Sequence, residues 1–280
     1  MQENKKLAYL GPGGTFSEEA ALYYSASSQR QLVEYPTIVA VINAVCEKET
    51  DEGLVPLENS LEGGVGVTLD QLVRQEGLYI RHELTRPVRQ CLMAKEKLTL
   101  AQIKIVYSHP HALGQCADYI DHHLPHTECL PVESTAAAAA LAAQNTGAAA
   151  IAPGRAAALY NLLLLAENIQ DNQDNSTRFI ILAETDHPPT GEDKTSLVFT
   201  IPDGPGSLYK ILGHFARRAI NLTRIESRPS RKIVGDWLFF IDCEGHRLDS
   251  GRKELWEEIE KEVSFFKLLG SYPRNNFNVQ

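Results

Sequence analysis

The stretch Asn175-Ser176-Thr177-Arg178-Phe179 opens an apolar run, residues 179–183, and the two together predict a buried strand with polar groups at its mouth. The Arg178 guanidinium is a planar fork of donors that suits a carboxylate, and the neighbouring Thr177 hydroxyl can donate a further hydrogen bond. The pair therefore suits an anionic organic acid. Taken alone, the stretch also fits a polar loop that turns into a strand, so the rest of the chain has to decide.

The chain before this stretch repeats one order, in which a short apolar strand is followed by a polar turn and then by a helix. Strands are expected at residues 6–10, 32–35, 53–57, 103–107, 127–132 and 148–152. Helix starts are expected after four of them, at Thr15, Ser60, Ser108 and Ser134. This order predicts a mainly parallel, layered α/β architecture. If the helix starts converge on one cleft, their N–H groups can bind a ligand with more than one carboxylate.

A glycine-rich loop, GPGG at residues 11–14, precedes Thr15 and Glu18, which have capping-box spacing. Free N–H groups at the start of a helix favour an anion, so the loop is a candidate anion site. It matches neither the Walker pattern nor GxGxxG, and a tight turn without a ligand explains it equally well.

Composition narrows the function classes. A formal net charge of -9 gives no general attraction to nucleic acid or to anionic membranes, so neither is an expected partner. The first six residues are polar and no apolar run is long enough to cross a bilayer, so a cytoplasmic protein is expected. The five cysteines contain no CxxC pair and the histidines match no zinc signature, so neither a disulfide framework nor a metal site is expected.

A second pattern follows residues 185–193, which read as a linker from their composition. Strands and helices then alternate as βαββαβ over about 75 residues, the order of a ferredoxin-like sandwich. The two middle strands of this order, residues 221–228 and 237–243, could pair edge to edge with another copy.

Five motifs in this order resemble those of the prephenate dehydratase family, and the resemblance runs from residue 6 to residue 271. They are GPGGTFS (11–17), PLENS (56–60), YSHPHALGQC (107–116), ESTAAAA (133–139) and NSTRF (175–179). GSLY (206–209) and ESRP (226–229) stand where an ACT regulatory domain has its two motifs. A monofunctional member is expected, because the chain starts at the first strand without the chorismate mutase segment fused to some relatives.

The resemblance implies an α/β fold in which a two-lobed catalytic domain, like the periplasmic binding proteins, precedes the ferredoxin-like ACT domain. The expected divisions are a catalytic domain at 1–184, a linker at 185–194, the ACT domain at 195–272 and a tail at 273–280. Thr177 matches the essential threonine of the family. The residues that match its substrate-binding cleft motifs are Arg178, Glu58, Asn59, Ser60, Thr15, Ser108, Gln115 and Ser134.

The chemistry of prephenate fits such a site without a cofactor. The ring becomes aromatic when it loses a hydroxyl and carbon dioxide, so no metal, hydride carrier or covalent nucleophile is needed. Thr177 is expected to assist departure of the hydroxyl by a hydrogen bond that strengthens as charge develops. Arg178 and the helix starts would hold a carboxylate. Glu58 would repel a dianion, so we expect it to orient Asn59 or to be structural.

For regulation, the resemblance implies that phenylalanine inhibits the enzyme from a site where two ACT domains meet, which requires a homodimer or homotetramer. The residues expected there are Gly206, Ser207, Leu208, Tyr209, Asn221, Leu222, Glu226 and Ser227. A chain cut near Asp186 is expected to stay active but to lose inhibition. Two other functions stay open: arogenate dehydratase, and a non-catalytic sensor of an aromatic acid.

Overall fold

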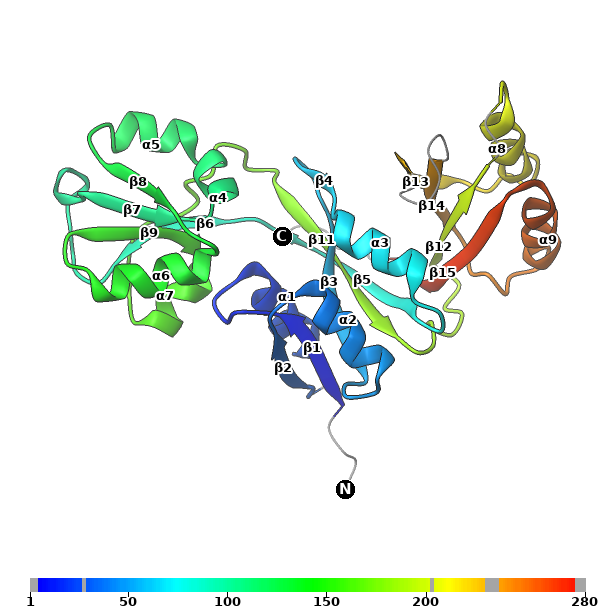
Figure 1. Ribbon diagram of the computed structural model, residues 1–280, viewed down its shortest axis with the longest axis horizontal. Helices are drawn as coiled ribbons and strands as arrows, with labels where there is room; N and C mark the ends of the chain where they lie inside the picture. The colour runs from blue at the N-terminus through cyan, green and yellow to red at the C-terminus, as the bar shows by residue number, and fades with distance from the viewer. Residues whose placement is uncertain (1–4, 27–28, 202–203, 230–236, 275–280) are drawn as a thin grey trace.

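The computed structural model describes residues 5–26, 29–201, 204–229 and 237–274, and shows two α/β lobes and an ACT-like domain (Figure 1). The expected tail therefore lies mostly outside the described residues. The expected fold class, two lobes followed by a βαββαβ domain, is confirmed.

The first lobe is built on a sheet with the order β2-β1-β3-β11-β5, and the short β4 pairs with the end of β3. Its strands are β1 (Lys6–Leu10), β2 (Gln31–Tyr35), β3 (Glu52–Asn59), β4 (Gly63–Gly64), β5 (Tyr79–Pro87) and β11 (Ser176–Ala183). Its helices are α1 (Phe16–Ser25), α2 (Ile38–Cys46) and α3 (Gly66–Arg74). The first three strands are parallel, whereas β11 runs antiparallel to both β3 and β5. The stretch that opens the apolar run thus becomes an inner strand, with Phe179 and residues 180–182 almost fully buried.

The second lobe has a sheet with the order β10-β6-β9-β7-β8. Its strands are β6 (Gln90–Ala94), β7 (Ile105–Ser108), β8 (Glu128–Pro131), β9 (Ala148–Pro153) and β10 (Leu163–Ala166). Its helices are α4 (Pro110–Gly114), α5 (Ala117–His123), α6 (Thr135–Gln144) and α7 (Gly154–Tyr160), with a 3-10 turn at Leu100–Gln102. The chain passes between the lobes twice, from β5 to β6 and from β10 to β11. The two connecting segments lie side by side, since Val88 N donates to Asn175 O at 2.8 Å.

The ACT domain has the sheet order β13-β14-β12-β15. Its elements are β12 (Asp193–Thr200), α8 (Ser207–Arg217), β13 (Leu222–Pro229), β14 (Trp237–Glu244), α9 (Arg252–Glu262) and β15 (Phe265–Pro273). Of the two strands expected to pair with another copy, only β13 lies at an edge. β14 is enclosed between β13 and β12, so it has no free edge for a second chain.

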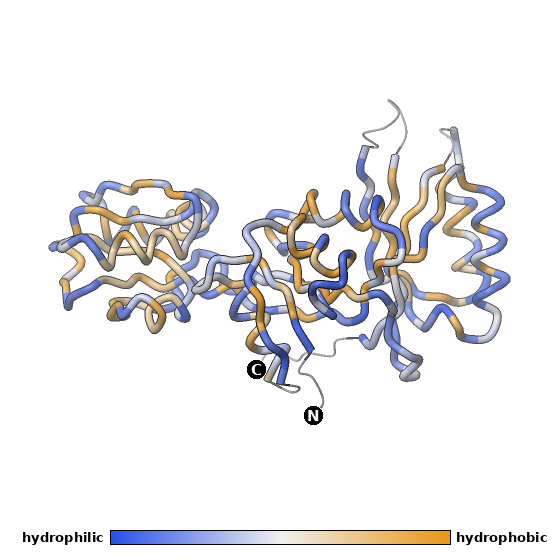
Figure 2. Tube along the Cα trace, turned by 60° about the horizontal axis from the view of Figure 1, so that its bottom comes forward, coloured by the Kyte–Doolittle hydropathy of each residue, from blue (hydrophilic) through white to orange (hydrophobic). Residues whose placement is uncertain are grey.

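The ACT domain packs onto the first lobe through a shared core. One cluster of buried side chains contains Ile80 and Ile180 of the lobe together with Phe240, Leu269 and Tyr272 of the ACT domain. In Figure 2 the strands are mostly hydrophobic and many surface turns hydrophilic. Gly270 allows the close approach, since a Cβ there would lie 2.3 Å from the backbone oxygen of Ile80.

No helix in the described part of the chain is both long and apolar enough to span a bilayer.

Candidate active site

A cavity of about 960 Å³ lies between the two lobes and is lined from both sides. The first lobe contributes Thr15, Asn59 and Thr177, and the second lobe contributes Gln115 and Ser134. The structure thus brings five of the expected residues to one cavity, and their side chains come from the ends of strands or the starts and ends of helices, as ligand sites in open α/β sheets do.

Asn59 holds the Thr177 hydroxyl in place. Asn59 Nδ2 donates to Thr177 Oγ1 at 3.1 Å, and it also lies 2.9 Å from Asn175 Oδ1. The other end of the same amide accepts from the backbone N–H groups of Leu61, at 3.0 Å, and Glu62, at 3.2 Å. Because Thr177 Oγ1 accepts a hydrogen bond from Asn59, its own proton remains available for a ligand in the cavity.

Helix starts also face this cavity. Ser134 caps α6, where its hydroxyl accepts from Ala137 N at 3.0 Å, and Thr15 caps α1 by accepting from Glu18 N at 3.4 Å. Gln115 ends α4 and links the lobes, since its Nε2 donates to Glu62 Oε1 at 3.2 Å.

The glycine loop is a turn whose N–H groups are already used by the protein. Gly13 N donates to Glu34 Oε2 at 2.9 Å, and Gly14 N donates to Glu18 Oε2 at 2.7 Å. An anion site would need these N–H groups to be free, but the two carboxylates already accept from them, so a tight turn describes the loop better.

Tyr9 lies next to this loop, and its hydroxyl is neutral at ordinary pH, because burial and the charge of Glu34 raise its pKa to about 12.

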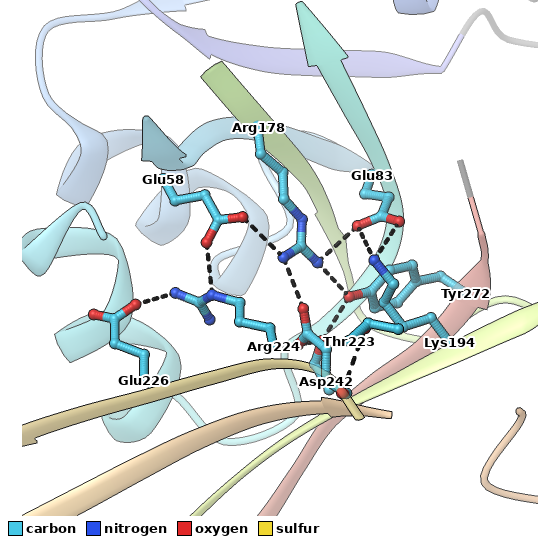
Figure 3. A network of polar contacts seen from close by, with 10 residues as sticks. Glu58, Glu83, Arg178, Lys194, Thr223, Arg224, Glu226, Asp242 and Tyr272 are labelled. Atoms are coloured by element: carbon cyan, nitrogen blue, oxygen red, sulfur yellow. Dashed lines mark hydrogen bonds and ion pairs between the residues drawn. The ribbon is translucent and has the colours of Figure 1, made fainter. Parts of the chain in front are cut away.

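Arg178 and Glu58 do not line this cavity, contrary to the expectation for both. Thr177 pairs with Asn59 and Arg178 with Glu58 in the β11–β3 register, and side chains alternate between the faces of a strand. Thr177 therefore faces the cleft, and Arg178 points toward the ACT domain (Figure 3). Arg178 Nη1 lies 2.7 Å from Asp242 Oδ2 there, and Nη2 lies 2.6 Å from Glu83 Oε2.

Burial would lower the pKa of Arg178, but the negative charges of the nearby carboxylates, first Asp242 and then Glu83 and Glu58, outweigh it and raise this pKa well above its ordinary value. Likewise, burial favours the neutral form of Asp242, yet Arg178 and other nearby cations hold its pKa below the usual range. Both side chains are therefore charged at neutral pH and bound to each other.

Ser108 and Ser60 also lie outside the cavity. Ser108 is fully buried and its hydroxyl donates to Ile151 O at 2.6 Å, while His109 takes the capping position of α4. Ser60 Oγ accepts from Ser176 N at 3.0 Å and so ties β3 to β11. No helix starts at Ser60, because the chain forms β4 first and α3 begins only at Gly66.

Neither lysine nor arginine is among the described residues that line the cavity. Its basic side chains are His109 and His111, and His111 Nδ1 lies 2.9 Å from Glu62 Oε2 of the other lobe. Burial and the nearby His111 lower the pKa of His109. No group of three His, Cys, Asp or Glu side chains is placed to hold a metal ion, within the ranges described above.

Sequence reasoning did not find several lining residues, namely Glu34, Glu62, Gln90, Glu133 and Tyr160. Glu133 is the first residue of the ESTAAAA motif and Glu62 lies two residues after PLENS, which is a usable signal. Glu34, Gln90 and Tyr160 come from separate elements and reach the cavity only through the packing of the lobes.

The residues expected to bind an effector divide into two groups in a single chain. Gly206 is the N-cap residue of α8 and has a left-handed conformation, with φ 80°, and Tyr209 in the first turn of the helix is 79% exposed. Ser207 and Leu208 belong to the same turn, whereas Asn221 Nδ2 donates to Glu244 Oε1 at 3.2 Å just before Leu222 and β13. Glu226, which precedes Ser227 on β13, pairs with Arg224 and lies against Gly64 of the first lobe.

Comparison with known proteins agrees with this architecture. The family model described as prephenate dehydratase matches residues 7–187, and the ACT domain model matches residues 195–256. A bifunctional chorismate mutase/prephenate dehydratase of Aquifex aeolicus is 41% identical over 98% of this chain and 75% of the relative.

Solved structures with the same architecture are also found. Prephenate dehydratase from Arthrobacter aurescens in complex with L-Phe has a TM-score of 0.87 and 37% identity, covering 96% of this chain and 90% of the other. GqqA, described as a novel type of quorum quenching acylase, has a TM-score of 0.86 and 29% identity, covering 98% and 99%. The chain belongs to the prephenate dehydratase family and carries an ACT domain.

Proposed function

We propose that this chain converts prephenate to phenylpyruvate by decarboxylative dehydration, and that phenylalanine inhibits it through the ACT domain. Its family membership supports the reaction, and the position of Thr177 in the cavity between the lobes is the observation that carries the assignment. Cytoplasmic phenylalanine biosynthesis is the setting that this activity implies.

Thr177 assists departure of the ring hydroxyl. Asn59 donates to Thr177 Oγ1, which polarises the hydroxyl and leaves its proton directed to the substrate. The resulting hydrogen bond strengthens as charge builds on the leaving oxygen, an effect worth about 3 to 4 kcal/mol when the donor is fixed in advance. Asn59 is fixed by contacts at both ends of its amide, so Thr177 does not have to reorganise during the reaction.

The helix starts keep the carboxylate-binding role expected for them, and histidines take the place of Arg178 in it. The start of α6, at Ser134 and Thr135, faces the cavity with the positive end of the helix dipole, which favours a carboxylate. His109 and His111 supply further donors on the same lobe. Leu10, Phe16, Val65 and Val88 form apolar parts of the wall, where a poorly hydrated carboxylate would lose carbon dioxide more easily.

Phenylalanine binds between the ACT domains of two copies in this proposal, so the working enzyme is at least a homodimer. Support comes from the relative solved with L-Phe and from the edge position of β13. Ile225 on β13, Trp237 on β14 and Tyr209 near the start of α8 are 49%, 47% and 79% exposed in the single chain, which leaves apolar surface for a partner. We place the catalytic domain at 1–184, the linker at 185–194 and the ACT domain at 195–272.

The test is to mix the purified protein with prephenate and to follow phenylpyruvate. Formation of phenylpyruvate, with turnover reduced by added phenylalanine, is expected. A parallel assay with arogenate decides between the two dehydratase substrates. Tight binding of prephenate without turnover would contradict the enzyme and support the sensor.

Because GqqA is described as a quorum quenching acylase, an acylated quorum-sensing signal is a suitable third compound to test in this assay. No hydrolysis is expected, because the contact that Thr177 Oγ1 makes is with the Asn59 amide, which cannot act as the base that a hydroxyl nucleophile requires.

A further inference from the structure

Thr177, which carries the proposed catalytic hydroxyl, and Asn59, which holds it, each have a sequence neighbour whose side chain points to the opposite face of the sheet. Thr177 and Asn59 are paired across β11 and β3, and the next pair in the register is Arg178 with Glu58. Thr177 and Arg178 share one peptide bond, as do Glu58 and Asn59. A shift of the Arg178 and Glu58 pair along or across the strands therefore moves Thr177 and Asn59 as well.

The first connection runs from Arg178 into the ACT sheet. Its guanidinium contacts Asp242 on β14 at 2.7 Å and the Tyr272 hydroxyl on β15 at 3.0 Å. Ser196 Oγ on β12 donates to Asp242 at 2.5 Å, so the carboxylate is itself held by a neighbouring strand. Asp242 is 2% exposed and Arg178 is 8% exposed, which leaves water little access to replace these contacts.

A second connection runs from Glu58 to the ESRP motif that the sequence assigned to effector binding. Glu58 Oε2 lies 2.6 Å from Arg224 Nε on β13, and Arg224 in turn pairs with Glu226 (Figure 3). Arg228 of the same motif donates to the backbone oxygen of Gly66, the first residue of α3, at 3.1 Å. The edge strand at the expected effector interface thus reaches the end of β3 through charged side chains.

The two connections differ in how freely they can rearrange. The Arg178 contacts lie in a packed and buried setting. Glu58, Arg224 and Glu226 line a cavity of about 540 Å³ between the first lobe and the ACT domain, which Arg178 also lines, whereas the partners of Arg178, namely Asp242, Glu83 and Tyr272, do not. This space allows the Glu58–Arg224 pair to re-form or break while the Arg178 contacts keep the domains together.

We propose that Arg178 and Glu58 are positioning residues, and that their ion pairs with Asp242 and Arg224 let the ACT domain set the geometry of Thr177 and Asn59. This inference rests on the proposed dehydratase activity. Re-pairing of Arg224 at β13 shifts Glu58, and with it the Asn59 amide that holds Thr177. The substrate then still enters the cleft, but the hydroxyl is less well placed for the leaving oxygen.

Arg224→Gln tests this connection without touching the cleft. Its kcat is expected to fall by about 5- to 20-fold with KM changed less than twofold, and inhibition by phenylalanine is expected to weaken by a similar factor, the usual range of coupling between sites. Arg224→Lys should recover part of both. The matched control is Arg218→Gln, because Arg218 pairs with Glu258 inside the ACT domain, at 2.7 Å.

A merely structural pair would lower stability in Arg224→Gln but leave kcat and inhibition of the folded enzyme unchanged, and that result would overturn the proposal. Equal losses in Arg218→Gln would overturn it too. If Arg224→Gln does not fold, Glu58→Gln and Arg224→Lys provide the same comparison. Failure of the proposed activity is distinguishable, because the wild-type chain would then form no phenylpyruvate. A double-mutant cycle of Glu58→Gln and Arg224→Gln, measured by urea unfolding, gives the interaction free energy of the Glu58–Arg224 pair independently of catalysis.

Discussion

Replacing Arg178 by glutamine separates the position that the structure gives this residue from the role that the sequence suggested. The substitution removes the cation that Asp242 and Glu83 share, and both carboxylates are almost fully buried. Removing one partner of a buried ion pair typically costs about 3 to 5 kcal/mol, because the other charge stays buried without that partner; Lys194 remains 2.9 Å from Glu83, so most of the loss falls on Asp242. Arg178→Gln should therefore lower the free energy of unfolding by about this amount.

The loss should depend on pH with a definite sign. In the wild type the pKa of Asp242 is depressed, so its charged form stabilises the fold at neutral pH, and this contribution disappears as pH falls through the folded-state pKa. Without Arg178 burial dominates and the pKa of Asp242 rises. The difference in stability between wild type and Arg178→Gln should consequently be large at pH 7 and shrink in acid. Urea unfolding at several pH values measures it.

Steady-state kinetics on the same variant complete the test. If Arg178 positions Thr177, kcat falls more than KM rises. A variant of normal stability whose only defect is a raised KM would refute this reasoning, because it would place the guanidinium on the substrate.

Three further predictions concern other parts of the chain. A chain that ends at Asp186 loses Phe240, Leu269 and Tyr272 from the shared core, so it should aggregate or unfold rather than stay active as the sequence suggested; gel filtration shows which. His82 has a pKa lowered to about 4, mainly by burial, so stability should fall between pH 6.5 and 4, less steeply in His82→Gln. Asn59→Ala should reduce kcat about tenfold or more, measured with prephenate, because Thr177 loses its donor.

The layout of the fold and much of the cleft followed from the sequence. Strand, polar turn and helix in repeated order predicted the α/β lobes, and the helix starts at Thr15 and Ser134 do face one cavity. Each of these helix starts lies beyond the carboxyl end of a parallel strand of its own lobe, where open α/β sheets bind ligands, and the packing of the two lobes brings the two ends to one cavity.

Errors arose where a motif was treated as a unit. Thr177 and Arg178 are adjacent in a strand, so alternation sends their side chains to opposite faces, and the same holds for Glu58 and Asn59. The period of two was visible in the sequence and would have allowed only one residue of each pair into the cleft. The partners of Arg178 on the face opposite the cleft could not be predicted from this alternation. Asp242 and Tyr272 contact Arg178 only because the ACT sheet packs on β5.

The most direct test of the account is the turnover of Thr177→Val compared with Thr177→Ser. Valine has a similar shape but no hydroxyl, so kcat for prephenate should fall by about 100- to 1000-fold with little change in KM, as when one fixed donor to a developing charge is lost. Serine keeps the hydroxyl beside Asn59 and should retain much of the activity. Wild-type turnover in Thr177→Val would show that another group releases the ring hydroxyl and would contradict the account.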